Sequence, residues 1–140
     1  MPDDLPERLE AGTLNVPGIA GLCAGMAYLR QTGIGNIGKR EQEQAKICAE
    51  GLQKQGMKVF TGTHQAGTVS FLPGMDCELA AQILARQAIA VRAGLHCAPL
   101  AHESAGTLQT GTVRISFGHD AAFAQTRVLL QAVSKLLPWE

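Results

Sequence analysis

The chain has 140 residues and a mass of 14.8 kDa, which is the size of a single domain. Twelve basic and twelve acidic residues give a formal net charge of zero, which argues against nucleic-acid binding and against docking on an anionic membrane. No apolar run reaches the ~18 residues of a transmembrane helix, and the polar, acidic first ten residues do not resemble a signal peptide. We therefore expect a cytoplasmic protein with no nucleic-acid partner and no membrane partner.

The apolar residues are mostly small. Twenty are Ala, and the aromatic residues are one Trp, one Tyr and four Phe. Gly occurs 16 times, above the usual share of ~7%. This composition predicts a thin core and apolar surfaces that suit packing against another protein or domain.

The sequence of residues 1–55 predicts an extended arm followed by two helices. Residues 1–15 contain two prolines and no regular period, so they predict an extended arm ahead of a single α+β domain at residues 16–140. Apolar residues at helical spacing predict a helix over 17–31 and a second over 36–55, capped by Asn36. The apolar positions expected on the buried face of the second helix are Ile37, Ile47, Cys48 and Leu52.

The sequence from residue 57 onward predicts four short strands and two further helices. Short strands are expected at residues 57–61, 68–72, 89–92 and 112–117, the first two paired across the turn between them. Helices are expected from 77 to 87, capped by Asp76, and from 121 to Leu137, capped by Asp120. The order ααββαββα describes a small antiparallel sheet of about four strands covered by helices, and therefore an α+β fold.

One segment lacks any helical or strand period. Residues 94–111 form an 18-residue stretch that contains Cys97, His96, His102 and Glu103, and loops of this length are commonly functional. Cys97 is a candidate nucleophile, because a thiolate is favoured by a neighbouring imidazole or a positive charge such as Arg92. Arg114 lies mid-strand, where it is either a solvated residue or a carboxylate clamp.

Three other patterns favour structural interpretations. His96, Cys97, His102 and Glu103 do not have the spacing of a zinc site, so no metal is expected and His102 is interpreted as an exposed loop residue. The sequence GIGNIG at 33–38 matches a dinucleotide-binding pattern, but a predicted helix precedes it, which favours a helix–helix turn. Three cysteines lie outside residues 94–111 and are interpreted as small buried residues: Cys23, Cys48 and Cys77.

Three motifs together resemble a known family. RAGLHCAPL at residues 92–100 resembles the Arg-x-Gly-x-His-Cys loop of the cysteine desulfurase and selenocysteine lyase group of class V aminotransferases. EAGTLN at 10–15 resembles the family's Glu-x-Gly-Thr-x-Asn segment, and GTVRIS at 111–116 resembles its Val-Arg-x-Ser strand. The resemblance covers essentially the whole chain and implies the small C-terminal domain of a fold-type I pyridoxal-phosphate enzyme.

The resemblance implies a chemistry for specific residues. These enzymes are pyridoxal-phosphate homodimers that take sulfur or selenium from cysteine or selenocysteine and leave alanine. By resemblance, Cys97 is the nucleophile that holds the sulfur as a persulfide, and Arg114, Arg92 and His96 bind the substrate. Gly12 and Thr13 are implied to reach the phosphate of the partner subunit's cofactor.

The chain also departs from the family pattern. The family's Schiff-base lysine usually follows a His, and none of the five lysines here does so. We therefore expect that the large cofactor-binding domain is absent, that no cofactor is bound covalently, and that the isolated chain is inactive. Two alternatives remain open: a non-catalytic split subunit that docks on a separate large domain, and a thiol carrier in which Cys97 accepts persulfide. A sulfur acceptor protein is a further possible partner, and apolar surface is expected around the first helix and the Cys97 loop.

Overall fold

The computed structural model describes residues 3–136, which fall into two compact units. Unit 1 is Met1–Asn36 and unit 2 is Ile37–Glu140. Unit 1 holds a short 3-10 helix, η1 (Glu7–Leu9), within the segment expected to be an extended arm, and the helix α1 (Val16–Thr32). The predicted boundary at residue 16 thus lies inside unit 1.

Helix α1 is capped at its start and exposed along its length. The Asn15 side chain accepts a hydrogen bond from the Gly18 N–H at 3.0 Å, and the helix ends at Gly33, which has φ +84°. No α1 residue is buried, although most of its side chains are apolar. The exposed apolar surface expected around the first helix is therefore present. Cys23 is exposed as well, so the prediction that it is a buried residue is wrong.

Helix α2 (Ile34–Lys54) begins directly after Gly33. The predicted cap at Asn36 is wrong, because Asn36 lies inside the first turn and its side-chain amide donates to the Thr32 carbonyl at 3.1 Å. The GIGNIG sequence is a helix–helix turn, as predicted. No helix among the described residues is long and apolar enough to cross a membrane.

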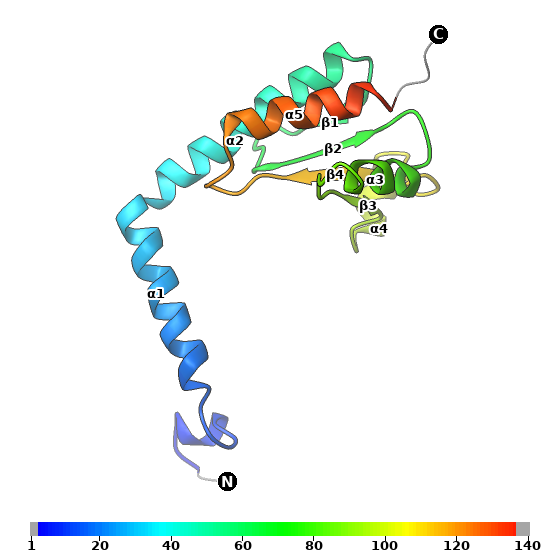
Figure 1. The fold of residues 1–140 in the computed structure, drawn as a ribbon. Coiled ribbons are helices and arrows are strands. Elements are labelled where there is room, and N and C mark those ends of the chain that lie inside the picture. Colours follow the sequence, from blue (N-terminus) through cyan, green and yellow to red (C-terminus); the bar gives the residue numbers. More distant parts are fainter. Residues whose placement is uncertain (1–2, 137–140) are drawn as a thin grey trace. The chain divides into compact units, whose positions relative to one another are not determined.

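Unit 2 contains a four-stranded antiparallel sheet in the order β1-β2-β4-β3 (Figure 1). Its strands are β1 (Lys58–Phe60), β2 (Thr68–Leu72), β3 (Arg92–Gly94) and β4 (Thr112–Ser116). The α+β fold is confirmed, including the predicted pairing of β1 with β2. Strand β3 begins three residues later than predicted, because a turn that contains the left-handed Ala88 (φ 59°) occupies the segment after the preceding helix.

The segment between β3 and β4 is not wholly irregular. Helix α4 (Pro99–Ser104) forms within it, so the observed order is ααββαβαβα after η1. Pro99 lies in the first turn, where its fixed φ and missing N–H are suited to a helix start. The prediction of a segment without secondary structure is therefore corrected over these six residues.

Helices α3 (Cys77–Ala85) and α5 (Phe123–Ser134) complete unit 2. Asp76 caps α3 as predicted, since its carboxylate accepts from the Leu79 N–H at 2.9 Å. The predicted cap of α5 by Asp120 is wrong: the helix starts at Phe123, and the Ala122 N–H donates to the Gln125 side chain at 2.9 Å. The predicted helix end at Leu137 lies outside the described residues.

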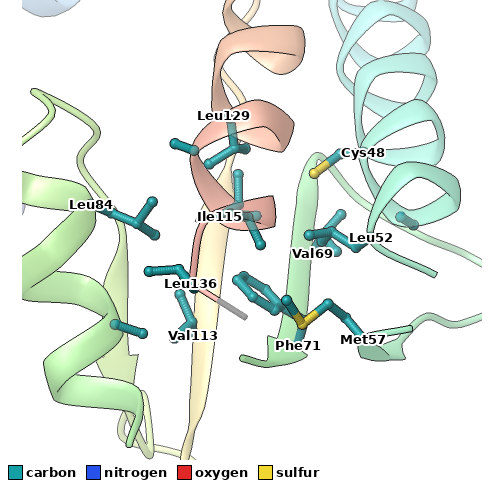
Figure 2. Packing of buried hydrophobic residues seen from close by; sticks show 14 of the residues in the cluster. Cys48, Leu52, Met57, Val69, Phe71, Leu84, Val113, Ile115, Leu129 and Leu136 are labelled. Carbon is teal, nitrogen blue, oxygen red and sulfur yellow. The ribbon is translucent and has the colours of Figure 1, made fainter. Parts of the chain in front are cut away.

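One hydrophobic cluster joins the helices α2, α3 and α5 to the sheet (Figure 2). Leu52 from α2, Phe71 from β2, Leu84 from α3 and Val113 from β4 are fully buried in it. Cys48 and Cys77 are buried, as predicted, whereas Ile47 is 39% exposed and does not belong to the buried face of α2. The sheet face that carries Val113 and Ile115 is therefore the core face, and Arg114 lies on the opposite face.

A polar connection also holds α2 against α5. The Gln44 amide donates to the Ala121 carbonyl at 2.6 Å, and its carbonyl oxygen accepts from the Thr126 hydroxyl at 2.7 Å. Gln44 and Thr126 are 0% and 1% exposed, so both polar side chains are satisfied inside the core.

Candidate functional site

The register of β3 and β4 places two arginines next to each other. Arg92 pairs directly with Arg114 across the two strands, so both side chains lie on the sheet face opposite the core. The Nε of Arg114 is buried without a hydrogen-bond partner. Within residues 3–136 neither guanidinium forms an ion pair with a carboxylate. Like charges directly opposite each other are destabilising, so this arrangement suits an anion that binds both.

Cys97 lies beside one of these arginines. Its side chain is exposed, and the Arg92 Nη2 donates toward its Sγ at 3.6 Å. His96 and Cys97 both have left-handed backbones, with φ of 53° and 60°. Non-glycine residues in this conformation are held there by surrounding contacts and occur often at functional sites. The predicted grouping of Cys97 with Arg92 is therefore present, with the sulfur accessible for attack on a ligand.

His96 connects the cysteine to the sheet. Its Nε2 lies 3.1 Å from the Thr112 hydroxyl, at the start of β4. Burial lowers the pKa of His96, and the charges of Arg114, His102 and Arg92 lower it further, while a hydrogen bond to the Thr112 backbone opposes them. His96 is therefore neutral at pH 7. We name Arg92, His96, Cys97 and Arg114 the cysteine cluster.

His102 was not expected in this environment. It is 7% exposed, its Nδ1 lies 2.8 Å from the Thr107 hydroxyl, and its ring centroid lies 5.6 Å from that of His96. The prediction that it is an exposed loop residue is wrong, because α4 turns its side chain inward. Pro99 was the sequence signal for that helix. No signal in the sequence pointed to Thr107 or Thr112, whose roles depend on the loop's tertiary path.

The other candidate residues are not part of this cluster. Gly12 and Thr13 belong to unit 1, are exposed, and Gly12 has φ +81°. Glu103 is exposed on α4. In the described part of the chain, no three His, Cys, Asp or Glu side chains gather as a metal site requires. The cofactor role of Gly12 and Thr13 stays a prediction.

The lysines are placed away from the β3–β4 segment in the chain. Lys39, Lys46 and Lys54 lie on α2, Lys58 lies on β1, and Lys135 follows α5. The cysteine cluster offers two guanidiniums, a thiol and a neutral imidazole, and it offers no amine. Such a donor set suits a carboxylate and a sulfur atom, and it does not suit covalent capture of an aldehyde.

Comparisons with known proteins identify the family of this chain. The Aminotransferase class-V family model matches residues 2–129. A probable cysteine desulfurase of Pyrococcus abyssi is 34% identical over 136 residues, which is 94% of this chain and 33% of that protein. Another probable cysteine desulfurase, from Xylella fastidiosa strain Temecula1, is 42% identical over 96 residues, or 66% of this chain and 23% of that protein.

Solved structures show the same similarity. The apo structure of a cysteine desulfurase from Thermococcus onnurineus has a TM-score of 0.86 and 36% identity, over 94% of this chain and 33% of that one. The cysteine desulfurase CsdA of Escherichia coli, solved in an S-sulfonic acid form, has a TM-score of 0.84 and 30% identity over the same shares. This chain thus spans a third or less of the length of these relatives. With three family motifs, the α+β fold and the family match in agreement, the chain belongs to the class V aminotransferases.

Proposed function

We propose that this chain is the substrate- and sulfur-binding part of a cysteine desulfurase, in which Cys97 receives the sulfur of the substrate cysteine. The observation that carries the proposal is the contact of 3.6 Å between Arg92 Nη2 and Cys97 Sγ, beside Arg114, whose buried Nε has no hydrogen-bond partner. A nucleophilic thiol and an anion site on one sheet edge match the two ends of a free cysteine. The similarity to cysteine desulfurases supports the same substrate class.

The two arginines bind the substrate carboxylate in this proposal. Arg114 has a buried Nε that lacks a partner, and a carboxylate can satisfy it with a charge-assisted hydrogen bond. Arg92 adds a second positive charge and also donates toward the thiol. Because His96 is neutral, it does not compete with either guanidinium for the anion.

Cys97 then accepts the sulfur. Its thiolate attacks the substrate sulfur, an S–S bond forms, and the C–S bond of the substrate breaks. The carbon keeps the bonding electron pair and takes up a proton, which yields alanine and a persulfide on Cys97. The thiol is exposed, so the persulfide is accessible to a sulfur acceptor protein.

Pyridoxal phosphate belongs to the complete enzyme in this proposal. The cysteine cluster has no amine, so its residues do not fit the cofactor's aldehyde, and the chain's described residues account for no cofactor step. They account for binding the carboxylate and receiving the sulfur. A homodimer partner or large domain that supplies the cofactor, and a cytoplasmic location, are part of the proposal.

Two measurements on the 140-residue chain test this proposal. Incubation with pyridoxal phosphate and cysteine is expected to yield no alanine and no sulfide. Incubation with a low-molecular-weight persulfide is expected to add one sulfur atom at Cys97, measured by mass spectrometry of the peptide, and to add none there in Cys97→Ser. Alanine formation by the chain alone that is lost in Cys97→Ala would overturn the assignment of the cofactor chemistry to another part.

A thiol carrier is the second candidate. It is favoured by the exposure of Cys97 and by the Arg92 contact, neither of which requires a substrate carboxylate. The two candidates differ at Arg114, which a carrier does not need for loading. If Arg114→Gln accepts sulfur from free cysteine, in the presence of a separate cofactor-binding chain, as fast as the unaltered protein does, the carrier is the better description.

A further inference from the structure

The position of the Cys97 sulfur depends on a backbone that needs support. His96 and Cys97 are consecutive left-handed residues, a conformation that L-residues with side chains adopt rarely. Contacts around the loop must therefore select it over the ordinary right-handed and extended alternatives. The Arg92–Cys97 contact of 3.6 Å is a single interaction with an exposed side chain, so it does not by itself fix the loop.

The His96 ring is the first of these supports. Its Nε2 lies 3.1 Å from the hydroxyl of Thr112, which is 3% exposed on β4. This contact joins the residue before the nucleophile to the rigid strand that carries Arg114. A ring that rotates away from Thr112 would release the backbone next to Cys97.

His102 packs against the other side of this ring. The two ring centroids are 5.6 Å apart with planes inclined at 47°, a separation typical of interacting aromatic pairs. The groups that face the His96 ring are Arg92 from β3, Arg114 from β4 and His102 from α4. Neither arginine brings a counter-charge, and Nδ1 of His96 is buried without a hydrogen-bond partner, so packing and the contact of Nε2 with Thr112 hold the ring in place.

Thr107 fixes His102 in turn. Its hydroxyl lies 2.8 Å from Nδ1 of His102, and its N–H donates to the His102 carbonyl at 2.8 Å. Its own carbonyl accepts from the Gly111 N–H at 2.8 Å, directly before β4. A Cβ at Gly111 would lie 2.9 Å from the Gly94 Cα, so the two ends of the segment are in close contact.

We propose that His102 and Thr107 are positioning residues that hold the His96 ring, and through it the left-handed backbone that places Cys97 Sγ beside Arg92. Neither residue touches the sulfur or the anion site. This inference rests on the proposed function, because it concerns the same thiol. Its test uses thiol alkylation, which requires neither sulfur transfer nor a cofactor.

The test compares Thr107→Val, which removes the hydroxyl at nearly constant volume, with Thr107→Ser, which keeps it. Thr110→Val is the matched control, because Thr110 is an exposed threonine of the same segment that bonds only to the Gly111 carbonyl. Iodoacetamide labelling of the 140-residue chain is followed by peptide mass spectrometry. Cys23, which is exposed in unit 1, serves as the internal reference.

At pH 7 the ratio of Cys97 to Cys23 alkylation is expected to fall about fivefold in Thr107→Val, because the contacts of the Thr107 hydroxyl with Nδ1 and with the carbonyl oxygen of His102 are lost. The ratio is expected to stay unchanged in Thr107→Ser and Thr110→Val. If Thr107→Val does not fold by circular dichroism, His102→Asn, which keeps a hydrogen-bonding group near Nδ1 but removes the ring, is expected to show the same fall.

An unchanged ratio at pH 7 in a folded Thr107→Val or His102→Asn chain overturns the positioning role. Failure of the proposed function looks different: Cys97 then gains no sulfur from a persulfide donor even though the alkylation ratios follow the expected pattern.

Discussion

At the scale of single residues, the cysteine cluster contains a pair of like charges beside an exposed thiol. Arg92 and Arg114 are cross-strand partners without a described counter-ion, and His96 is neutral between them. The like-charge pair is unfavourable for folding by itself. Together these residues leave a site with positive charge next to an exposed thiol, which supports the proposed recognition of a small amino acid with a sulfur atom.

Replacing Arg114 by Gln is expected to leave the free energy of unfolding unchanged or to raise it by up to about 1 kcal/mol, since it removes a like-charge pair. Binding of free cysteine by the assembled enzyme is expected to weaken at the same time. Urea unfolding in a buffer without carboxylates measures the first effect. A loss of more than about 1 kcal/mol would show that Arg114 is a structural residue.

The His96 resonance is expected to titrate with a midpoint below 6.5, because burial and the neighbouring arginines lower its pKa. Its pKa is thus lower in the folded than in the unfolded chain, so the stability it contributes is present above about pH 6.5 and is lost as the pH falls through the folded value. NMR titration of the ring carbon-bound proton measures the midpoint. A His96 midpoint at or above 6.5 would contradict the lowered pKa.

At the scale of secondary-structure elements, α2 and α5 are joined by a buried hydrogen-bond network as well as by apolar contacts. Gln44 makes two of these bonds, to Ala121 and Thr126, from a position without solvent access. A buried polar side chain of this kind fixes which face of one helix meets the other.

Gln44→Leu is expected to lower the free energy of unfolding by about 1–3 kcal/mol, because it leaves the buried Thr126 hydroxyl without its acceptor and leaves Arg40 as the remaining side-chain donor to the Ala121 carbonyl. Gln42→Leu, at an exposed position on the same helix, is the matched control and is expected to change it by less than about 0.5 kcal/mol. Chemical denaturation measures both. Equal effects of the two substitutions would contradict the structural role of Gln44.

The sequence predicted some elements well and others poorly, for physical reasons. Strand β2 and the Asp76 cap follow from local patterns, because alternation and a side chain accepting an N–H are local interactions. Hydropathy predicts a buried Ile47 and an exposed Gln44, whereas in the structure Ile47 is exposed and Gln44 is buried. The reason is that the position of α5 decides which face of α2 is buried. In the candidate site, motifs suggested Cys97 and Arg114, whose roles stay predictions, whereas no motif suggested Thr107, since its contact with His102 depends on α4.

At the scale of the whole molecule, the buried core belongs to unit 2. Its hydrophobic cluster draws on α2, α3, α5 and the sheet, while no residue of α1 is buried. The small-residue composition is consistent with this division, because unit 2 fills its core with only one fully buried aromatic side chain, Phe71, among the described residues.

Leu22→Gln on α1 and Leu52→Ala on α2 are expected to differ sharply in effect. Leu22 is 64% exposed, so its substitution should leave the unfolding transition within about 0.5 kcal/mol of the unaltered chain. Leu52 is fully buried, and its truncation should cost about 2–5 kcal/mol. Thermal denaturation followed by circular dichroism measures both, and a comparable loss in Leu22→Gln would show that α1 contributes to the core.

Ligand binding at the paired arginines of β3 and β4, Arg92 and Arg114, also changes the stability of the folded chain. A ligand that binds only the folded chain stabilises it by RT ln(1 + [L]/Kd), so an amino-acid carboxylate at ~100 times its Kd adds about 2.7 kcal/mol. Relief of the repulsion between the two arginines is one of the contributions to that Kd. Under the proposed function, the midpoint of unfolding should therefore rise with the concentration of the substrate amino acid.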